Sequence, residues 1–266
     1  MGSFVWQMPD RDFGGLSGIE VFDGGRQFVA LGDKAMFITG RFQRYGAGHI
    51  RAVTAGPIRP LVGKNNGKPL AGRRADSEGL AIDSEGNAFV SFENRTRVAR
   101  LDLESGVVAD MKSYAAFASL PKNGALEALA VADGPVLYAV PEEPPTQNIP
   151  VYRWIEGEWD DSLALPRRGR FVPVGADIGP DGRFYLLERD FRGIGGFASR
   201  LRRFDLSEAG LSGEVTLLET PLALHDNLEG LSIWRDGRGA LRATMISDDN
   251  FLFVQQTEIV EYRLPD

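Results

Sequence analysis

The feature that most constrains this chain is a pattern that recurs five times along its length. A copy typically starts with a small or acidic residue and then glycine or alanine, and two runs of alternating apolar side chains follow, separated by a glycine turn. The second run closes on an acid in most copies. The copies start at Ser17, Glu78, Glu127, Val174 and Glu229. Alternation on both sides of a short glycine turn is typical of a β-hairpin, so we predict five hairpin-containing units.

The spacing of the copies favours one architecture. Successive copies lie about 50 residues apart, and repeats of that length with several strands each are typical of β-propeller blades. We therefore predict an all-β fold, a single β-propeller domain over residues 1–266 with five four-stranded blades. The loosely patterned stretch 61–76 leaves room for a sixth, degenerate blade. A β-sandwich whose hairpins resemble one another by chance is the alternative.

The two ends of the chain fit the propeller. The segments FVWQ (residues 4–7) and EIVEYRL (residues 258–264) both have the apolar alternation of strands. We expect them to pair within one blade and so to close the ring.

Composition excludes several classes of function. The 266 residues include no cysteine, which rules out disulfides, thiolate metal sites and cysteine nucleophiles. A net charge of −7 with scattered arginines argues against a nucleic-acid partner, and no apolar run is long enough to span a membrane. The motif GxSxG of serine hydrolases is absent, and His49 and His225 are too far apart in the repeat scheme to suggest zinc. We expect a monomer that acts on a small molecule.

Acidic residues recur at equivalent places in the repeats. Rotational repetition turns such a position into a ring around one axis, and carboxylates gathered in this way need a compensating cation. Calcium suits them because it accepts six to eight oxygen ligands in flexible geometry. The predicted calcium ligands are Glu78, Glu127, Glu229, Asp33, Glu93 and Asp248. The alternative is that these acids cap turns or pair with nearby arginines.

Further polar residues near these acids suggest catalytic and binding roles. We predict that Glu188 or Asp249 accepts a proton from a metal-bound water. Guanidinium and ammonium groups would hold an anionic substrate, since arginine binds oxyanions in a bidentate manner. The predicted substrate-binding residues are Arg189, Arg192, Lys34, Arg95 and Asn250.

Several segments resemble one known family. The segments GLSGIEVFDGGRQFVALGD, ADIGPDGRFYLLERDF, NLEGLSIWRDG and SDDNFLFVQQTEIVEYRL are similar to the phytase-like family with esterase-like activity, a group of exported β-propellers. The resemblance spans nearly the whole chain. It implies hydrolysis of phosphate or other esters and a periplasmic or secreted location, although the sequence as given shows no signal peptide. It brings no catalytic residue with it.

Two functional hypotheses follow. The first is a metal-dependent hydrolase, with calcium the expected ion, that cleaves a small anionic ester at the mouth of the propeller channel. The second is a non-catalytic propeller that binds a small ligand or a protein on the same face, with the metal in a structural role. The fold alone does not separate them, because propellers host both kinds of function.

Overall fold

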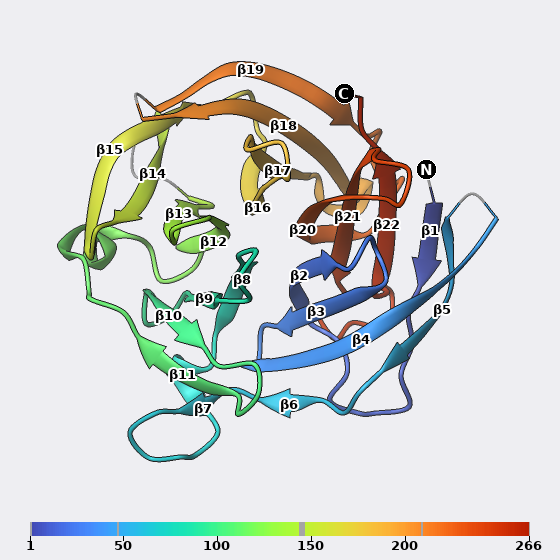
Figure 1. Cartoon of the computed structure of the whole chain (residues 1–266), viewed down its shortest axis with the longest axis horizontal. Coiled ribbons are helices and arrows are strands. Elements are labelled where there is room, and N and C mark those ends of the chain that lie inside the picture. Colours follow the sequence, from blue (N-terminus) through green and yellow to red (C-terminus); the bar gives the residue numbers. More distant parts are fainter. Residues whose placement is uncertain (1, 47, 144–146, 209, 266) are drawn as a thin grey trace.

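The chain folds into a five-bladed β-propeller. The computed structural model describes residues 2–46, 48–143, 147–208 and 210–265, and its strands form five sheets around one axis (Figure 1). Five inner strands contact one another in a closed ring. These are β2 (Leu16–Phe22), β8 (Ser77–Ile82), β12 (Leu126–Ala132), β16 (Val172–Ile178) and β20 (Asn227–Arg235). The predicted all-β propeller of five blades is confirmed.

The remaining strands complete the blades from the axis outward. Blade 1 continues with β3 (Gln27–Gly32), β4 (Met36–Tyr45) and β5 (His49–Ala55). Blade 2 continues with β9 (Ala88–Phe92), β10 (Arg97–Leu101) and β11 (Val107–Asp110). Blade 3 continues with β13 (Val136–Pro141), β14 (Asn148–Ile155) and β15 (Glu158–Pro166). Blade 4 continues with β17 (Phe184–Phe191), β18 (Phe197–Ser207) and β19 (Gly210–Glu219), and blade 5 with β21 (Leu241–Asp248) and β22 (Glu258–Arg263).

The first strand of the chain completes the last blade. Strand β1 (Gly2–Val5) pairs antiparallel with β22, with Gly2 opposite Glu261 and Val5 opposite Glu258. Both ends of the chain thus lie in blade 5, beside blade 1 (Figure 1). The predicted closure of the ring by these two segments is confirmed.

The stretch between blades 1 and 2 does not form a sixth blade. Strand β6 (Arg59–Pro60) pairs with β4 in blade 1, and β7 (Val62–Gly63) runs parallel to β11 at the outer edge of blade 2. The 3₁₀ helix η1 (Gly72–Arg74) then leads into β8. Two further 3₁₀ helices are η2 (Ala115–Ser119) and η3 (Gly193–Gly195). Over the described ranges, no helix has the length and apolar character needed to cross a membrane.

The hydrophobic core is divided into five clusters, one between each pair of neighbouring blades. In the cluster between blades 1 and 2, for example, Leu31 and Phe37 pack with Val90 and Phe92, and all four side chains are essentially inaccessible to solvent. The alternation predicted from sequence produces this arrangement, because one face of each blade packs on the blade before it and the other face on the blade after it.

A column of glycines brings the inner strands into close contact. Gly18, Gly79, Gly175 and Gly230 occupy equivalent positions directly after the first residue of each repeat, and blade 3 has Ala128 there. A Cβ atom on Gly79 would lie 2.7 Å from the Cβ atom of Leu129 in the next blade, and one on Gly175 would collide with the main-chain oxygen of Glu229. The backbones of adjacent blades therefore approach closer than a larger side chain allows.

We expect Gly175→Ala to destabilise the protein by about 1–3 kcal/mol, because the added methyl group forces β16 and β20 apart. Denaturant unfolding measures the change. Gly237→Ala is the matched control: a Cβ there meets open space, so its effect should stay within about 0.5 kcal/mol. Equal stability of the two variants would show that the inner strands do not depend on this contact.

Candidate functional site

Each inner strand has an irregularity at the first residue of its repeat. The register between inner strand and second strand shifts around the same five residues, which are Ser17, Glu78, Glu127, Val174 and Glu229. A β-bulge of this kind inserts an unpaired residue and re-aims its side chain. The repeated position that sequence analysis identified is therefore a repeated bulge.

The channel below these bulges is almost closed. Its cavity volume is only about 10 Å³, and its lining includes Ile19, Leu80, Leu129, Ala176 and Leu231. A space of that size holds about one water molecule. The acids at the bulges, Glu78, Glu127 and Glu229, therefore lie on one face of the propeller, which we call the acidic mouth. Small molecules do not pass from this face through the channel to the other face.

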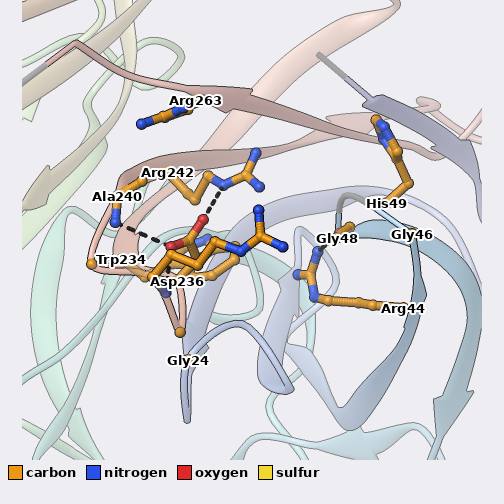
Figure 2. A pocket seen from close by; sticks show the side chains of 13 residues that line it. Gly24, Arg44, Gly46, Gly48, His49, Trp234, Asp236, Ala240, Arg242 and Arg263 are labelled. Carbon is orange, nitrogen blue, oxygen red and sulfur yellow. Dashed lines mark hydrogen bonds and ion pairs between the residues drawn. The ribbon is translucent and has the colours of Figure 1, made fainter.

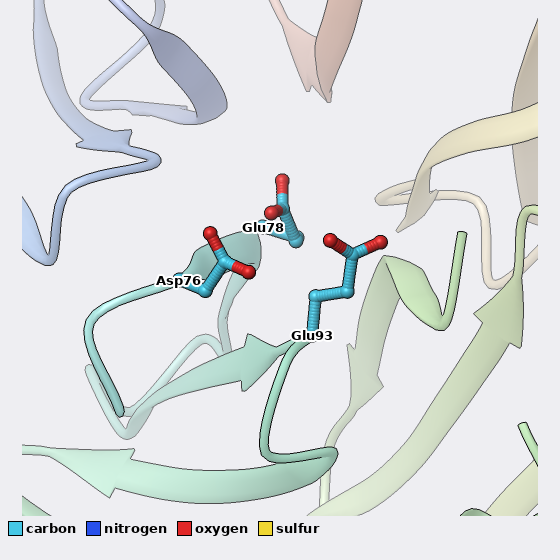
Figure 3. Close-up of side chains that lie close together, drawn as sticks. All are labelled: Asp76, Glu78 and Glu93. Carbon is cyan, nitrogen blue, oxygen red and sulfur yellow. The ribbon is translucent and has the colours of Figure 1, made fainter. Parts of the chain in front are cut away.

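Three carboxylates at the acidic mouth lie close enough to share one cation. Carboxylate oxygens of Asp76, Glu78 and Glu93 all lie within 4.8 Å of one another. Glu78 comes from the bulge of β8, Asp76 immediately precedes that strand and Glu93 follows β9, so the three side chains point toward one another from the inner hairpin of blade 2 (Figure 3). Glu93 also accepts hydrogen bonds from the main-chain N–H groups of Gly124 and Ala125, which tie it to blade 3.

Carboxylates from other blades extend this group. Burial raises the pKa of Glu78 well above its usual value, and the negative charges of Glu229 and Glu93 raise it further. Burial also raises the pKa of Glu127, with added contributions from Glu78 and from a hydrogen bond to Glu93. Side chains that are far apart in the sequence thus affect one another's ionisation across blades 2, 3 and 5.

Asp33 and Asp248, which stand at the ends of β3 and β21, lie near the same carboxylates. Burial raises the pKa of Asp33 to about 6, against the opposing effect of Lys34 and with help from Glu229. Burial and the charge of Glu229 raise the pKa of Asp248 to about 8. The Oδ1 atom of Asp33 is buried and has no hydrogen-bond partner among the described residues. The structure therefore brings together all six residues that we predicted as calcium ligands; whether they bind a metal stays a prediction.

One arginine offsets part of this negative charge. Arg189 Nη1 donates to Glu229 Oε1 and to Asn227 Oδ1, each at 2.5 Å, and its Nη2 donates to Glu142 Oε1 at 2.5 Å. Burial opposes the charge on Arg189, but Glu229 and Glu142 more than compensate and raise its pKa. Arg189 thus links blades 3, 4 and 5, and its guanidinium is engaged by protein carboxylates.

Asp249 lies at the acidic mouth with both oxygens in use. It accepts hydrogen bonds from Gly15 N at 2.9 Å, Phe251 N at 3.1 Å and Thr257 Oγ1 at 3.0 Å. These contacts attach the loop after β21 to the segment that precedes β2. The structure therefore gives Asp249 a visible part in holding this loop in place.

Two of the predicted substrate-binding residues lie in or next to this loop. Lys34 has its Nζ atom 2.9 Å from the centre of the Phe251 ring, a cation–π contact. The exposed Asn250 donates from its side chain to Gln255 at 3.2 Å.

Other predicted site residues lie apart from the carboxylates. Glu188 has no exposed surface, and Arg200 Nε and Arg202 Nη2 donate to it at 2.8 and 2.6 Å within blade 4. Side chains alternate along β17, so Arg189 reaches the acidic mouth while its neighbour Glu188 points to the other side of the blade. Arg192 pairs with Asp190 at 2.8 Å, and Arg95 is exposed in the turn after β9.

A hollow beside Arg189 contains cations that sequence analysis missed. It has a cavity volume of about 480 Å³, and its lining includes Arg167, Arg170, Arg189 and Phe191. Arg170 contacts Asp190 at 3.4 Å, whereas no ion pair is recorded for Arg167 within the part of the chain that the structure describes. The arginine-rich run before β16, with Arg167, Arg168 and Arg170, could have indicated this hollow, but it lies outside the repeated pattern.

Asp76 and Glu142 were also missing from the predicted site. Asp76 stands two residues before Glu78, just outside β8, and the other repeats have no acid at the equivalent place. Glu142 occupies the same repeat position as Glu93, directly after the second strand of its blade. The repeat argument therefore reaches Glu142 but not Asp76.

A second carboxyl pair lies further along the inner strands. Glu20 on β2 accepts a hydrogen bond from Ser232 Oγ at 3.1 Å, and Asp177 on β16 accepts one from the main-chain N–H of Ile233. Burial raises the pKa of Glu20 well above its usual value, with a contribution from Asp177, and burial raises the pKa of Asp177 to about 7.

The metal-free protein is expected to lose stability as the pH rises. The pKa values of Asp33, Asp177 and Asp248 are about 6, 7 and 8 when folded, against 3.8 for an ordinary aspartate. In this window the folded state binds more protons than the unfolded state, so the free energy of unfolding falls with pH. We expect the melting temperature without metal to drop by on the order of 5 °C from about pH 5 to about pH 8. A melting temperature that rises over this range would contradict the assignment.

Comparison with solved structures shows the same type of fold. The α-L-arabinofuranosidase from Podospora anserina in complex with cellotriose matches with a TM-score of 0.54 and 14% identity, over 96% of this chain and 94% of that one. The PQQ-bound aldose sugar dehydrogenase from Streptomyces coelicolor matches with a TM-score of 0.50 and 12% identity, over 99% of this chain and 98% of that one. Identities this low show the fold alone.

Sequence comparison identifies the family. No curated protein matches the chain. The sequence model of the phytase-like family, described as the esterase-like activity of phytase, matches residues 11–251. That match covers most of the blades and the whole acidic mouth, and the chain therefore belongs to the phytase-like family.

Proposed function

We propose that this protein is a metal-dependent hydrolase of phosphate or other esters, with its active site at the acidic mouth. The observation that carries the proposal is the group formed by Asp76, Glu78 and Glu93, whose oxygens lie within 4.8 Å of one another among further carboxylates. Family membership supports ester hydrolysis as the reaction.

The donor set fits calcium. All candidate ligands are carboxylate oxygens, the donors that hard divalent cations accept, and more of them are close by than one small ion needs. Asp76, Glu78 and Glu93 would hold the ion, with Asp33 and Glu127 beside them. A divalent cation held by these residues would supply Lewis-acid chemistry: it would polarise an ester oxygen and lower the pKa of a bound water. The buried, unpartnered Oδ1 atom of Asp33 supports a ligand or proton at this place.

Asp33 is the best candidate for the proton acceptor. Its carboxylate lies among the close acids, and in the metal-free protein burial raises its pKa to about 6, which makes it a stronger base than an ordinary aspartate. Asp249 has both oxygens occupied by hydrogen bonds that hold a loop, and Glu188 is enclosed by Arg200 and Arg202. We therefore propose Asp33 for the role that sequence analysis assigned to Glu188 or Asp249.

The hollow next to Arg189 is suited to the anionic part of the substrate. Arg167 and Arg170 line it, and Glu142 and Arg189 form its border with the acidic mouth. An anionic group held by these arginines would place the adjoining ester bond toward the carboxylates. The substrate class that follows is a small ester with a phosphate or carboxylate group.

The alternative is a non-catalytic propeller in which the cation is structural. One observation favours this alternative: the acids come from the inner strands of three different blades, with Glu78 on β8, Glu127 on β12 and Glu229 on β20. A cation at their centre would join those blades. In that case calcium would raise the melting temperature strongly, and the protein would turn over no ester.

Glu78→Gln is expected to weaken calcium binding at least about tenfold, since it removes one of three close carboxylates. Calorimetry on chelator-treated protein measures the affinity, and turnover of phosphate, carboxylate and lactone esters should be lost in the variant and on chelation. Because the substitution removes a buried like charge, the metal-free melting temperature should not fall. Glu85→Gln, in an exposed turn on the opposite face, is the control. Unchanged calcium affinity in Glu78→Gln, or turnover that survives chelation, would refute the proposal.

Arg170→Gln is expected to raise KM for anionic esters about tenfold and to leave KM for neutral esters unchanged, because it removes a charge-assisted contact in the hollow beside Arg189. Initial-rate kinetics on matched charged and neutral substrates measure the difference. Arg51→Gln removes the same charge from the exposed side of β5 and should affect neither substrate. Equal changes for both substrates would place the anionic group elsewhere.

A further inference from the structure

A hollow on the face opposite the acidic mouth has no part in the proposed hydrolysis. It has a cavity volume of about 760 Å³ and lies where the β2–β3 turn, the β4–β5 hairpin and the β20–β21 turn meet. These connections belong to blade 1 and blade 5, the two blades that meet where the ring closes. The acidic mouth lies at the other ends of the same strands, so the two sites are separate.

Cationic side chains surround this hollow. Figure 2 shows the guanidinium groups of Arg44, Arg242 and Arg263 and the imidazole of His49 around one open space, and Arg238 also contributes to the lining. The whole chain has a net charge of −7, so four arginines in one concave place depart from its average. A hollow lined by charges of one sign concentrates ligands of the opposite sign.

One arginine is held rigidly as part of the wall. Arg44 forms two parallel hydrogen bonds with Glu261, at 2.6 and 2.8 Å, and donates to the main-chain oxygens of Gly25 and Gly48 at 2.6 and 2.7 Å. Its guanidinium carbon lies 4.9 Å from the centre of the Trp234 ring. These contacts cross from blade 1 to blade 5, so this wall is preorganised.

The acid in the lining is already engaged. Asp236 accepts hydrogen bonds from Arg238 N at 2.9 Å, Ala240 N at 3.1 Å and Arg242 Nε at 3.0 Å. It therefore shapes the turn and orients Arg242. The exposed Arg238 and Arg263 have no recorded ion pair within the described ranges, which leaves both guanidinium groups available to a ligand.

We propose that this hollow binds a small molecule that carries two negative charges on oxyanion oxygens, the chemistry that phosphate monoesters and dicarboxylates share. Among the residues that the structure describes, four arginines and the carboxylates of Asp236 and Glu261 lie in or beside the lining, and this excess of positive charge suits a dianion. The planar guanidinium groups of Arg238 and Arg263 bind its oxygens in a bidentate manner. Because the walls come from blades 1 and 5, a bound dianion joins the two blades at the ring closure.

The test uses the full chain after chelator treatment, with no metal added, so that the acidic mouth cannot bind phosphate through calcium. Arg170→Gln is titrated in parallel, and phosphate binding that this variant weakens is assigned to the hollow beside Arg189 and left out of the comparison. Inorganic phosphate and succinate are titrated against the wild type by calorimetry and by thermal melting, with sodium chloride at matched ionic strength as reference. The double variant Arg238→Gln/Arg263→Gln is compared with Arg51→Gln, which removes a charge from the outer strand of blade 1 outside the hollow.

We expect saturating phosphate to raise the melting temperature of the wild type and of Arg51→Gln by at least about 3 °C beyond chloride. The double variant should bind phosphate at least about tenfold more weakly while melting at the wild-type temperature in chloride. Succinate that matches phosphate indicates recognition of any dianion, and weaker succinate binding indicates a phosphate site; both support the proposal. Phosphate that acts no differently from chloride, or that binds the double variant as tightly as the wild type, overturns it.

Discussion

The close approach of five inner strands is the constraint on which the rest of this structure depends. Glycines such as Gly79 and Gly175 leave no side chain between neighbouring strands, so the backbones of adjacent blades touch around the axis. The bulged residue directly before each glycine is then carried to the same face in every blade. Carboxylates that are more than a hundred residues apart, as Glu78 and Glu229 are, come together through this packing and not through any local motif.

Gathering so many acids has a cost in stability. Burial and mutual repulsion oppose ionisation of Glu78, Glu127 and Asp248, and Arg189 relieves only the side of the group formed by Glu142 and Glu229. Natural folds tolerate such unfavourable electrostatics mainly where function requires them. The same packing that makes the ring compact thus gathers buried carboxylates whose charge a bound cation would offset.

Sequence analysis predicted the parts of the structure that depend on local pattern. The alternating hairpins gave the blade number and the ring closure, and their equivalent positions indicated the six acids that converge. Glu188 and Arg189 show the limit: they are adjacent in sequence, yet strand alternation sends one into an arginine pair inside blade 4 and the other to the acidic mouth. The hollow beside Arg167 and the one beside Arg263 depend on how blades pack, which no single segment encodes.

The pairing of β1 with β22 also determines when the ring can close during synthesis. Residues 2–5 leave the ribosome some 250 residues before their partner, residues 258–263. Until then β1 has no partner strand to accept or donate its main-chain hydrogen bonds. A nascent or truncated chain therefore exposes an unpaired strand edge, which makes it a natural target for chaperones and proteases.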